Sequence, residues 1–408
     1  MNPQDRPFKP VTLTIAMLAL AAVSARSGSA ASDWPQWLGP DVNGVSTETN
    51  WQGTFPPEGP TVLWEQQIGA GYAAAAVHDG KLYTAGWKNG QDTIYCLDAE
   101  TGEGVWTYSY KIGRYNNQHN GGPAATPAVA SGRVYMLSRE AELFCLQADS
   151  GKLLWSKKLK GEFGLNIPSW AFSGSPIVRG DTLFVDVGRI IAMNKTSGAV
   201  LWKTRDYGAA YSTPKPFTLD GRRLLSAFPR SGLVVLDASN GRELATHPWE
   251  TRYGVNAATP IVKGGRIFIS SGYGRGCALL EFGGQGLTVL WENKKMRNQM
   301  VTCVLVDAHL YGFDEDRLKC IDLASGRPAW SKRGLGKGSL MAGGGKLIVL
   351  SEDGELIIAD ASPDGFEIHG RAKLLDANRC WIMPVLAGGR IYCRSSPGQL
   401  VCVDVRAD

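Results

Sequence analysis

The stretch CLDAETGEGVW at residues 96–106 decides the fold of this chain, because the same phrase returns along the sequence. Full copies read CLQADSGKLLW at residues 145–155, AMNKTSGAVLW at 192–202 and CIDLASGRPAW at 320–330. Each copy has a small residue, then Asp, Asn or Gln two positions later, then Gly, and ends on Trp. With weaker copies included, the Asp-like position recurs at 98, 147, 194, 237, 281, 322, 360 and 404, in steps of 38 to 49 residues. These steps fit four-stranded propeller blades, whose repeats span ~40–45 residues.

The residue types of the phrase suit a hairpin turn that leads into an outer strand. Gly readily takes the positive φ of a tight turn, and the Asp or Asn before it bonds to nearby backbone N–H groups. The Trp on the next strand can bury its ring between neighbouring blades. We therefore expect structural docking roles for the tryptophans that end the copies and for one near the N-terminus: Trp64, Trp106, Trp155, Trp202, Trp291 and Trp330.

The last repeat lacks a fourth strand of its own. It offers strands over residues 382–386, 391–394 and 399–404, whereas TVLWE at residues 61–65 reads like every other fourth strand. We predict that residues 61–67 pair with residues 399–404 and close the ring, which removes strand edges that invite aggregation. The predicted fold is all-β: an eight-bladed β-propeller of four-stranded antiparallel blades, closed by an N-terminal strand.

The chain divides into an export signal, a lead-in and one repeat domain. Residues 1–30 combine a basic start, an apolar stretch over residues 11–23 and small residues, as a signal peptide does. The apolar stretch is shorter than the ~20 residues that span a bilayer, so we expect cleavage near Ala30, with an uncleaved anchor as the alternative. Residues 31–60 form a lead-in that packs on the propeller, and residues 61–408 form the eight blades. The expected location is the periplasm or cell envelope, or outside the cell.

Composition excludes several function classes. The chain has 43 Lys and Arg against 38 Asp and Glu, a net charge of +5, without a basic stripe for nucleic acid. Four of the eight cysteines occupy the small position of the phrase and read as small buried side chains: Cys96, Cys145, Cys320 and Cys402. The candidate disulfide joins Cys393 to Cys402 across the last hairpin. No Cys-x-x-Cys occurs, so neither a metal site nor thiol redox chemistry is expected.

The repeated phrase resembles the tryptophan-docking motif of the PQQ-like (quinoprotein alcohol dehydrogenase-like) β-propeller superfamily. This superfamily includes pyrroloquinoline-quinone (PQQ) alcohol dehydrogenases and outer-membrane assembly factors of the BamB type. The resemblance covers residues 61–404, and in length and blade number it is nearest to the BamB type. The chain departs from that type because it has no Cys before Cys96 to carry a lipid anchor. The lead-in DWPQWLGP at residues 33–40 resembles that of exported members, and we expect Trp34 and Trp37 to pack across the ring.

Binding residues are expected on the loops that join the fourth strand of one blade to the first strand of the next. These D-to-A loops lie on one face of a propeller, nearest its axis, and are less regular than the hairpins. They carry aromatic, amide and cationic side chains, from which we predict a ligand or partner site: Tyr115, Asn117, His119, Trp170, Tyr211, Arg252, Tyr253, Arg297, Lys337, Arg379 and Trp381. Tyr273 and Arg275, on a Gly-rich loop, belong to the same face.

Two functions remain at this point. Resemblance to the dehydrogenases implies Ca²⁺, an Asp base and a pair of adjacent cysteines, but the inner loops offer Asp206 and Asp376 only at their margins and the cysteine pair is missing. The favoured function is therefore a non-catalytic exported scaffold without a cofactor. It binds a protein, peptide or envelope polymer, including in outer-membrane protein assembly, and is compatible with a monomer. The alternative is a PQQ- and Ca²⁺-dependent oxidoreductase, with Arg297, Lys337 and Arg379 holding the quinone carboxylates.

Overall fold

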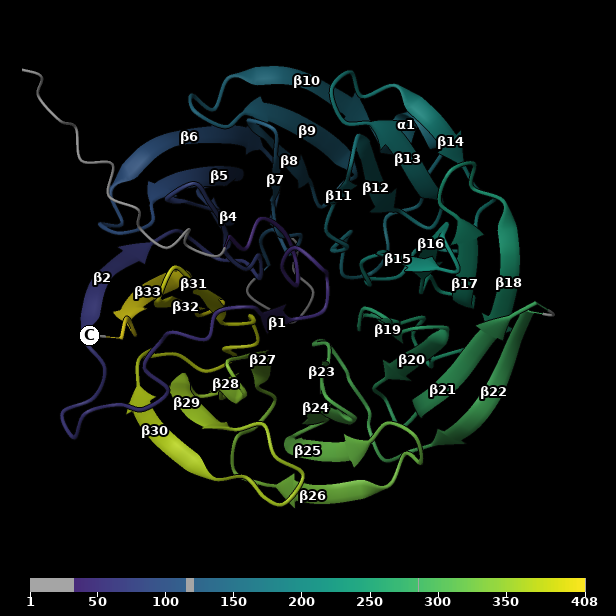
Figure 1. Cartoon of the computed structure of the whole chain (residues 1–408). Coiled ribbons are helices and arrows are strands. Elements are labelled where there is room, and N and C mark those ends of the chain that lie inside the picture. The colour runs from purple at the N-terminus through teal and green to yellow at the C-terminus, as the bar shows by residue number, and fades with distance from the viewer. Residues whose placement is uncertain (1–32, 115–120, 285, 408) are drawn as a thin grey trace, which may run out of the picture. The chain divides into compact units, whose positions relative to one another are not determined.

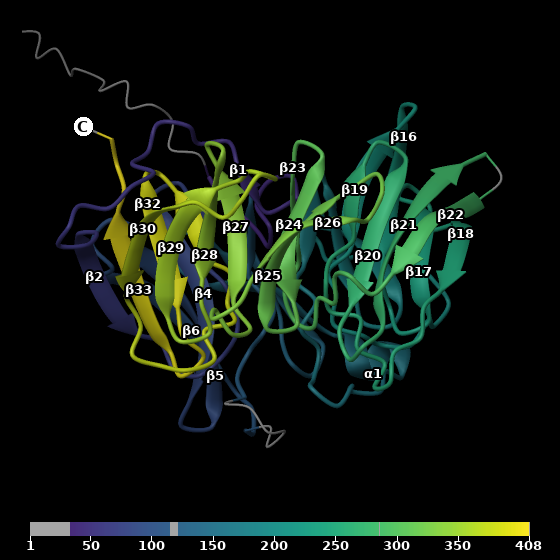
Figure 2. The same cartoon turned by 90° about the horizontal axis from the view of Figure 1, so that it is seen from below.

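The computed structural model describes residues 33–114, 121–284 and 286–407, which form eight four-stranded antiparallel sheets arranged around an axis (Figure 1). Seven of these blades run from an inner to an outer strand in chain order, and the eighth takes its outer strand from the N-terminal part of the chain, so the predicted all-β eight-bladed propeller is confirmed. Figure 2 shows the same ring from the side, with α1 (Leu159–Phe163) and β1 (Val45–Ser46) near opposite faces.

The first four blades follow one another along the chain, each with a short inner strand and longer outer ones. Their strands are β3 (Ala76–His78), β4 (Lys81–Lys88), β5 (Gln91–Asp98) and β6 (Gly104–Lys111); β7 (Ala128–Ala130), β8 (Arg133–Leu137), β9 (Glu142–Gln147) and β10 (Leu153–Lys158); β11 (Ile177–Arg179), β12 (Thr182–Asp186), β13 (Ile190–Asn194) and β14 (Val200–Lys203); β15 (Lys215–Leu219), β16 (Arg222–Ala227), β17 (Gly232–Asp237) and β18 (Glu243–Pro248).

The last four blades keep this order, and the eighth takes its outer strand from the N-terminal part of the chain. Their strands are β19 (Ile261–Lys263), β20 (Arg266–Ser271), β21 (Gly276–Gly283) and β22 (Gly286–Asn293); β23 (Val304–Val306), β24 (His309–Asp314), β25 (Arg317–Asp322) and β26 (Pro328–Lys332); β27 (Ser339–Gly343), β28 (Lys346–Leu350), β29 (Glu355–Asp360) and β30 (Ile368–Lys373); β31 (Val385–Ala387), β32 (Arg390–Arg394), β33 (Gln399–Asp404) and β2 (Val62–Gln67).

The N-terminal strand β2 pairs antiparallel with β33, with Trp64 opposite Cys402 and Gln67 opposite Gln399. A buried cation, Arg394 of blade 8, lies at the seam where this blade packs against blade 1. The Nη1 of Arg394 donates to the main-chain oxygen of Ala85 at 2.8 Å, and its Nη2 donates to that of Gly69 at 3.1 Å. The eighth blade is thereby tied to the first by hydrogen bonds as well as by packing.

The six docking tryptophans each bridge two blades. Trp106 of blade 1, for example, donates from Nε1 to the main-chain oxygen of Ala148 in the hairpin of blade 2 at 2.7 Å. Its ring lies over Gly151, where an added Cβ would sit 2.6 Å from the indole, and tilts against Tyr83 with centroids 6.0 Å apart. The Gly of the phrase is therefore required twice, for its positive φ and for the indole of the preceding blade. The tryptophans with an equivalent bond are Trp64, Trp155, Trp202, Trp291 and Trp330.

Two seams lack a docking Trp, and each has another aromatic residue. In blade 4, Ala245 stands opposite Val235, and the fully buried Trp249 instead donates to Ser271 of blade 5 at 3.1 Å. In blade 7, Gly370 takes the Trp position, and Phe55 of the lead-in packs over it. Loss of the motif is thus compensated by aromatic side chains from outside the repeat.

The lead-in crosses the hairpin face and contacts blade after blade. Trp34 forms an isolated bridge with Val77, and β1 pairs parallel with β27. Trp34, Leu38 and Val42 are each only 1% exposed. The hydrogen-bond partners of the lead-in on successive blades are Val77, Val129, Val178, Lys215, Thr259, Ala342 and Gly388. This segment therefore closes the central channel on the hairpin face.

All eight cysteines are buried and free, so the predicted Cys393–Cys402 disulfide is wrong. Cys402 lies opposite Tyr392, whereas Cys393 lies opposite Val401, and neighbouring residues of a strand point to opposite faces of the sheet. Burial raises the pKa of the Cys402 thiol to about 12, which keeps it protonated and unreactive. Among the described residues, no helix has both the length and the apolar character needed to cross a bilayer.

Candidate functional site

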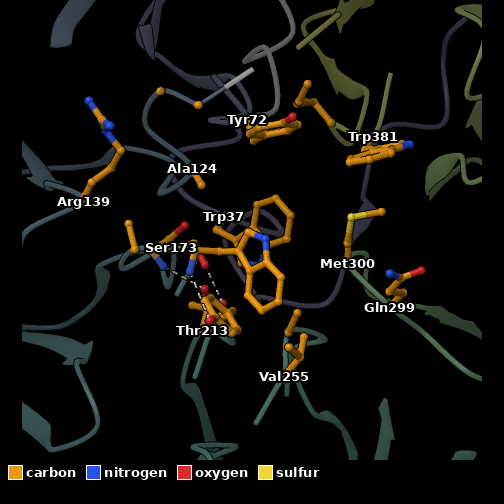
Figure 3. A pocket seen from close by; sticks show the side chains of 18 of the residues that line it. Trp37, Tyr72, Ala124, Arg139, Ser173, Thr213, Val255, Gln299, Met300 and Trp381 are labelled. Atoms are coloured by element: carbon orange, nitrogen blue, oxygen red, sulfur yellow. Dashed lines mark hydrogen bonds between the residues drawn. The ribbon is translucent and has the colours of Figure 1, made fainter. Parts of the chain in front are cut away.

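The loop face carries a funnel at the propeller axis, with a cavity volume of about 230 Å³. Its wall consists of D-to-A loops, the starts of inner strands and two B-to-C loops. Figure 3 shows Trp37 in the middle of this cavity, with Tyr72 and Trp381 on one side and Ser173 and Thr213 on another. The regular hairpins take no part in the wall, because they lie at the other face.

Trp37 of the lead-in forms the floor of the funnel. Its Nε1 donates to Oγ1 of Thr259 at 3.1 Å, which fixes the indole against the inner end of blade 5. The ring is partly exposed to the funnel, while its neighbours Gln36 and Leu38 are buried in the lead-in. The funnel is open at the loop face and closed at its base.

Two groups of aromatic side chains face each other across the funnel. On one side, Tyr72 and Trp381 stack with centroids 6.1 Å apart and ring planes at 19°. On the other side, Trp170 meets Tyr211 edge-on at 5.9 Å and Tyr253 at 6.4 Å. Aromatic faces of this kind can hold a flat or apolar group by stacking and burial.

The hydroxyl residues that open the inner strands bind neighbouring blades. Thr126 Oγ1 accepts from the backbone N–H of Ala74 at 3.0 Å, and Ser175 Oγ accepts from that of Thr126 at 2.9 Å. Thr213 Oγ1 in turn accepts from the N–H of Ser175 at 2.9 Å. The hydroxyl groups of the recurrent Ser/Thr-Pro pairs thus join neighbouring blades by hydrogen bonds around the axis.

The cations near the funnel differ in their partners. Arg139 lines the funnel and makes a two-pronged ion pair with the fully buried Asp92, at 3.0 and 2.9 Å. Arg297 is paired with Asp314 in the same way, at 2.6 and 3.0 Å. Burial alone would raise the pKa of Asp314, but hydrogen bonds from Arg297 and Lys319 hold it below its usual value. Both arginines have their charge balanced within the fold.

Lys337 lines the funnel, and its ammonium group pairs with no carboxylate in the described part of the chain. Arg379 lies next to Trp381 in the loop between blades 7 and 8 and makes no ion pair with a described residue. Arg252 stacks on Tyr253, with its guanidinium 5.2 Å from the ring centroid.

Carboxylates are absent from the described lining of the funnel, and the sequence of residues 115–120 contains none. Glu352 lies just behind the wall. It accepts hydrogen bonds from Trp381 Nε1 and from the main-chain N–H of Lys337, both at 3.0 Å. This carboxylate positions two funnel residues and has each oxygen already engaged.

One buried carboxyl group lies at the loop-face end of blade 3. Asp186 ends β12, is 6% exposed, and accepts a hydrogen bond from the N–H of Gly188 at 2.9 Å. Burial, and to a lesser extent the negative charge of Asp206, raises the pKa of Asp186 to about 7. The carboxyl group therefore titrates near neutral pH.

A group of potential metal ligands lies away from the funnel, in blade 7. The ligand atoms of Asp360, Glu367 and His369 lie within 4.8 Å of one another. Asp360 is already paired with Lys346 at 2.7 Å and with His369 at 2.9 Å. An ammonium group beside this carboxylate opposes the binding of a cation.

The structure brings four of the predicted site residues to the funnel wall: Trp170, Tyr211, Lys337 and Trp381. Tyr253 and Arg252 lie at the rim, and Arg297 is held by Asp314. Tyr115, Asn117 and His119 lie outside the described residues. Sequence reasoning missed Tyr72, Arg139 and Met300 as lining residues. Tyr72 belongs to the D-to-A loop that follows β2, so the closure of the ring was the signal that pointed to it.

The fold and the funnel define a class: an eight-bladed propeller with a single axial opening on its irregular face. The chain belongs to the family described as outer membrane protein assembly factor BamB, whose model matches residues 51–115 and 111–332. It is 24% identical to outer membrane protein assembly factor BamB of Moranella endobia (strain PCIT) over 330 residues, which cover 74% of this chain and 79% of that protein.

Solved structures show the same fold. BamB from Moraxella catarrhalis superposes with a TM-score of 0.60 at 16% identity, covering 85% of this chain and 98% of the other. Quinohemoprotein alcohol dehydrogenase from Comamonas testosteroni superposes with a TM-score of 0.67 at 12% identity, covering 92% and 81%. At these identities the likeness concerns the fold alone.

Proposed function

We propose that this protein is a non-catalytic scaffold of the cell envelope that acts in outer-membrane protein assembly and engages a protein partner at the loop-face funnel. Membership of the BamB family supports the process. The aromatic walls of the funnel, with Trp37 as its floor, support the site. The observation that carries the proposal is a cavity whose described lining is rich in stacking surfaces and contains no carboxylate or histidine, which is suited to binding.

A quinoprotein activity is the second candidate, because quinohemoprotein and BamB structures share the fold. Ca²⁺ requires oxygen ligands, mainly carboxylates, and a dehydrogenase requires a base within reach of its substrate. The described lining provides neither, since Glu352 is engaged by Trp381 and Lys337. The donor set does not fit PQQ with Ca²⁺, which favours a scaffold without a cofactor.

The location that we propose is the periplasmic side of the envelope, reached through a signal peptide at residues 1–30. The buried lead-in, which begins at Trp34, leaves the propeller complete without that segment. The loop face would remain accessible to a partner, because the lead-in covers only the hairpin face.

A genetic complementation experiment tests the process and the site together. Deletion of the gene should lower the amount of β-barrel proteins in the outer membrane, measured by quantitative proteomics of purified outer membranes. The wild-type gene should restore them, whereas the double variant Tyr72→Ala and Trp381→Ala should not. Leu201→Ala, which truncates a 55% exposed side chain on the outer strand β14, is the control and should restore them fully.

The assembly role, the binding site and the absence of enzyme activity can each be contradicted by a separate result. Unchanged outer-membrane proteins after deletion would contradict the role in assembly. Full restoration by the double variant, at wild-type protein levels, would place the partner elsewhere. Stoichiometric binding of PQQ in the presence of Ca²⁺, together with dye-coupled oxidation of an alcohol, would favour the enzyme instead.

A further inference from the structure

The funnel is open at one end only, and this limits what can enter it. Trp37 closes the base and is fixed by its bond to Thr259. The buried side chains of Trp34, Leu38 and Val42 hold the rest of the lead-in against the inner strands. A polypeptide cannot pass through such a cavity. What enters it is therefore a chain end, the tip of a turn or a projecting side chain.

The charges of the wall discriminate between the two ends of a polypeptide. An N-terminal ammonium group needs a carboxylate, and the described lining has none. A C-terminal carboxylate needs a cation, and Lys337 supplies one that no described carboxylate neutralises. The free charge of the funnel therefore complements a C-terminal carboxylate.

The remaining lining matches the other parts of a last residue. Trp37, Tyr72 and Trp381 offer aromatic faces around the cavity, as Figure 3 shows. Gln299 lines the same cavity, but its Oε1 is buried and offers the funnel no acceptor.

We propose that the funnel binds the C-terminal end of a polypeptide whose last residue is aromatic. The ring stacks within Trp37, Tyr72 and Trp381, and the carboxylate pairs with Lys337. This inference rests on the proposed scaffold function and specifies the part of the partner that the funnel recognises. Capture of a chain end by charge-assisted bonds together with a side-chain pocket is a known mode of peptide recognition.

Titration of the purified protein with short peptides, followed by calorimetry, tests the proposal. The probe is an N-acetylated five-residue peptide, Gly-Ser-Gly-Ser-Phe, with a free carboxylate. Its C-terminal amide should bind about tenfold more weakly, because the charge-assisted pair is lost. The same peptide ending in Gly should also lose about tenfold, because the stacking is lost. A peptide that begins with Phe and is amidated at its end should bind no better than the Gly-ended peptide.

Matched variants assign the preference to named side chains. Lys337→Met should bring the affinity ratio of acid to amide close to one while leaving the melting temperature unchanged. Lys332→Met removes an equal charge from the exposed end of β26 and should leave the ratio at its wild-type value.

Several results would overturn the inference. Equal affinity for acid and amide, or an acid preference that survives in Lys337→Met, would exclude the carboxylate pair. Absence of binding by every peptide would exclude the chain end as occupant. These outcomes are separate from the envelope test. If no peptide binds but the gene restores the outer-membrane proteins, only the chain-end inference is contradicted. If the peptide binds but deletion of the gene leaves the outer-membrane proteins unchanged, only the assembly role is contradicted.

Discussion

Tryptophan is used in two different ways in the outer ring and in the axial funnel. In the outer ring, residues such as Trp106 and Trp155 recur once per blade and give their N–H to a main-chain oxygen of the next blade, at 2.7 and 2.9 Å. In the funnel, Trp37, Trp170 and Trp381 come from loops of unequal length and leave ring surface open to the cavity. The regular set joins the blades, and the irregular set is available to a ligand.

The two seams without a docking Trp refine this comparison. Trp249 and Phe55 restore aromatic packing there, although neither belongs to the repeated phrase. Stability at the periphery therefore requires an aromatic group at each seam, whereas the route by which the chain delivers it can vary. Periodicity in the sequence indicates a structural role, but its absence does not by itself indicate a functional one.

The largest effect is expected at a regular seam. Trp106→Ala should lower the free energy of unfolding by about 3 kcal/mol, because a large, partly buried ring is lost between two blades. Denaturant titration followed by circular dichroism measures this change. Trp106→Phe, which removes only the N–H bond to Ala148, should cost about 1 kcal/mol. Peptide affinity of the folded variant should equal that of wild type, and a loss of affinity would break the division between the two sets.

Next in size is the glycine beneath the indole. Gly151→Ala should cost about 2 kcal/mol, since φ is +69° and the new Cβ would meet the ring of Trp106 at 2.6 Å. Gly132→Ala is the control in the same blade, with φ at +70° and open space around it. It should cost only about 1 kcal/mol. Equal losses in the two variants would mean that turn geometry alone selects Gly in the phrase.

A smaller, pH-dependent effect distinguishes the carboxylates at the two ends of the blades. The pKa of Asp322 in a repeated turn is lowered by its bond from Ser325, whereas burial raises the pKa of Asp186 to about 7. The contribution of Asp186 to stability is full below its unfolded pKa of about 4 and is lost as the pH rises through 7. Asp186→Asn should therefore raise stability by roughly 1–2 kcal/mol at pH 8 and by little at pH 4. Melting curves across this range measure the difference, and a constant offset would contradict it.

The smallest stability effect belongs to an irregular seam and to the funnel. Phe55→Ala should lower the free energy of unfolding by about 1 kcal/mol, because it exposes Gly370. Ile368→Ala is the control, at a 38% exposed position two residues before Gly370, and should lower it by less than about 0.5 kcal/mol.

Trp381→Ala should also change the free energy of unfolding by less than about 1 kcal/mol, because its ring lines an open cavity. Its expected effect is on binding, which the peptide titration measures. A large loss of stability in Trp381→Ala would assign this residue to the structural set.

Much of the periphery could be predicted from the sequence because each blade repeats the same local solution. The Gly turns, the small residues such as Cys96 and the docking tryptophans recur with a fixed spacing, so one copy explains the others. The disulfide prediction failed because strand register, which places Cys402 opposite Tyr392, is set by the hairpin and not by proximity in sequence. The funnel was predicted only in part, since loops have no periodicity: Arg139 lies in a segment that no pattern marked, and the loop that carries Tyr72 could be recognised only through the closure of the ring.

The sequence by itself determined the number of blades, the residues of the seams and the face on which irregular loops gather, because these depend on local turn chemistry and on spacing. The tertiary structure alone decided that Trp37 closes the axis, that Arg297 is neutralised by Asp314 and that Lys337 lines the funnel without an ion pair to a described carboxylate. These properties arise between segments that are tens or hundreds of residues apart. Only the closed propeller brings such segments together, and their charges and aromatic faces form one cavity only when the propeller is closed.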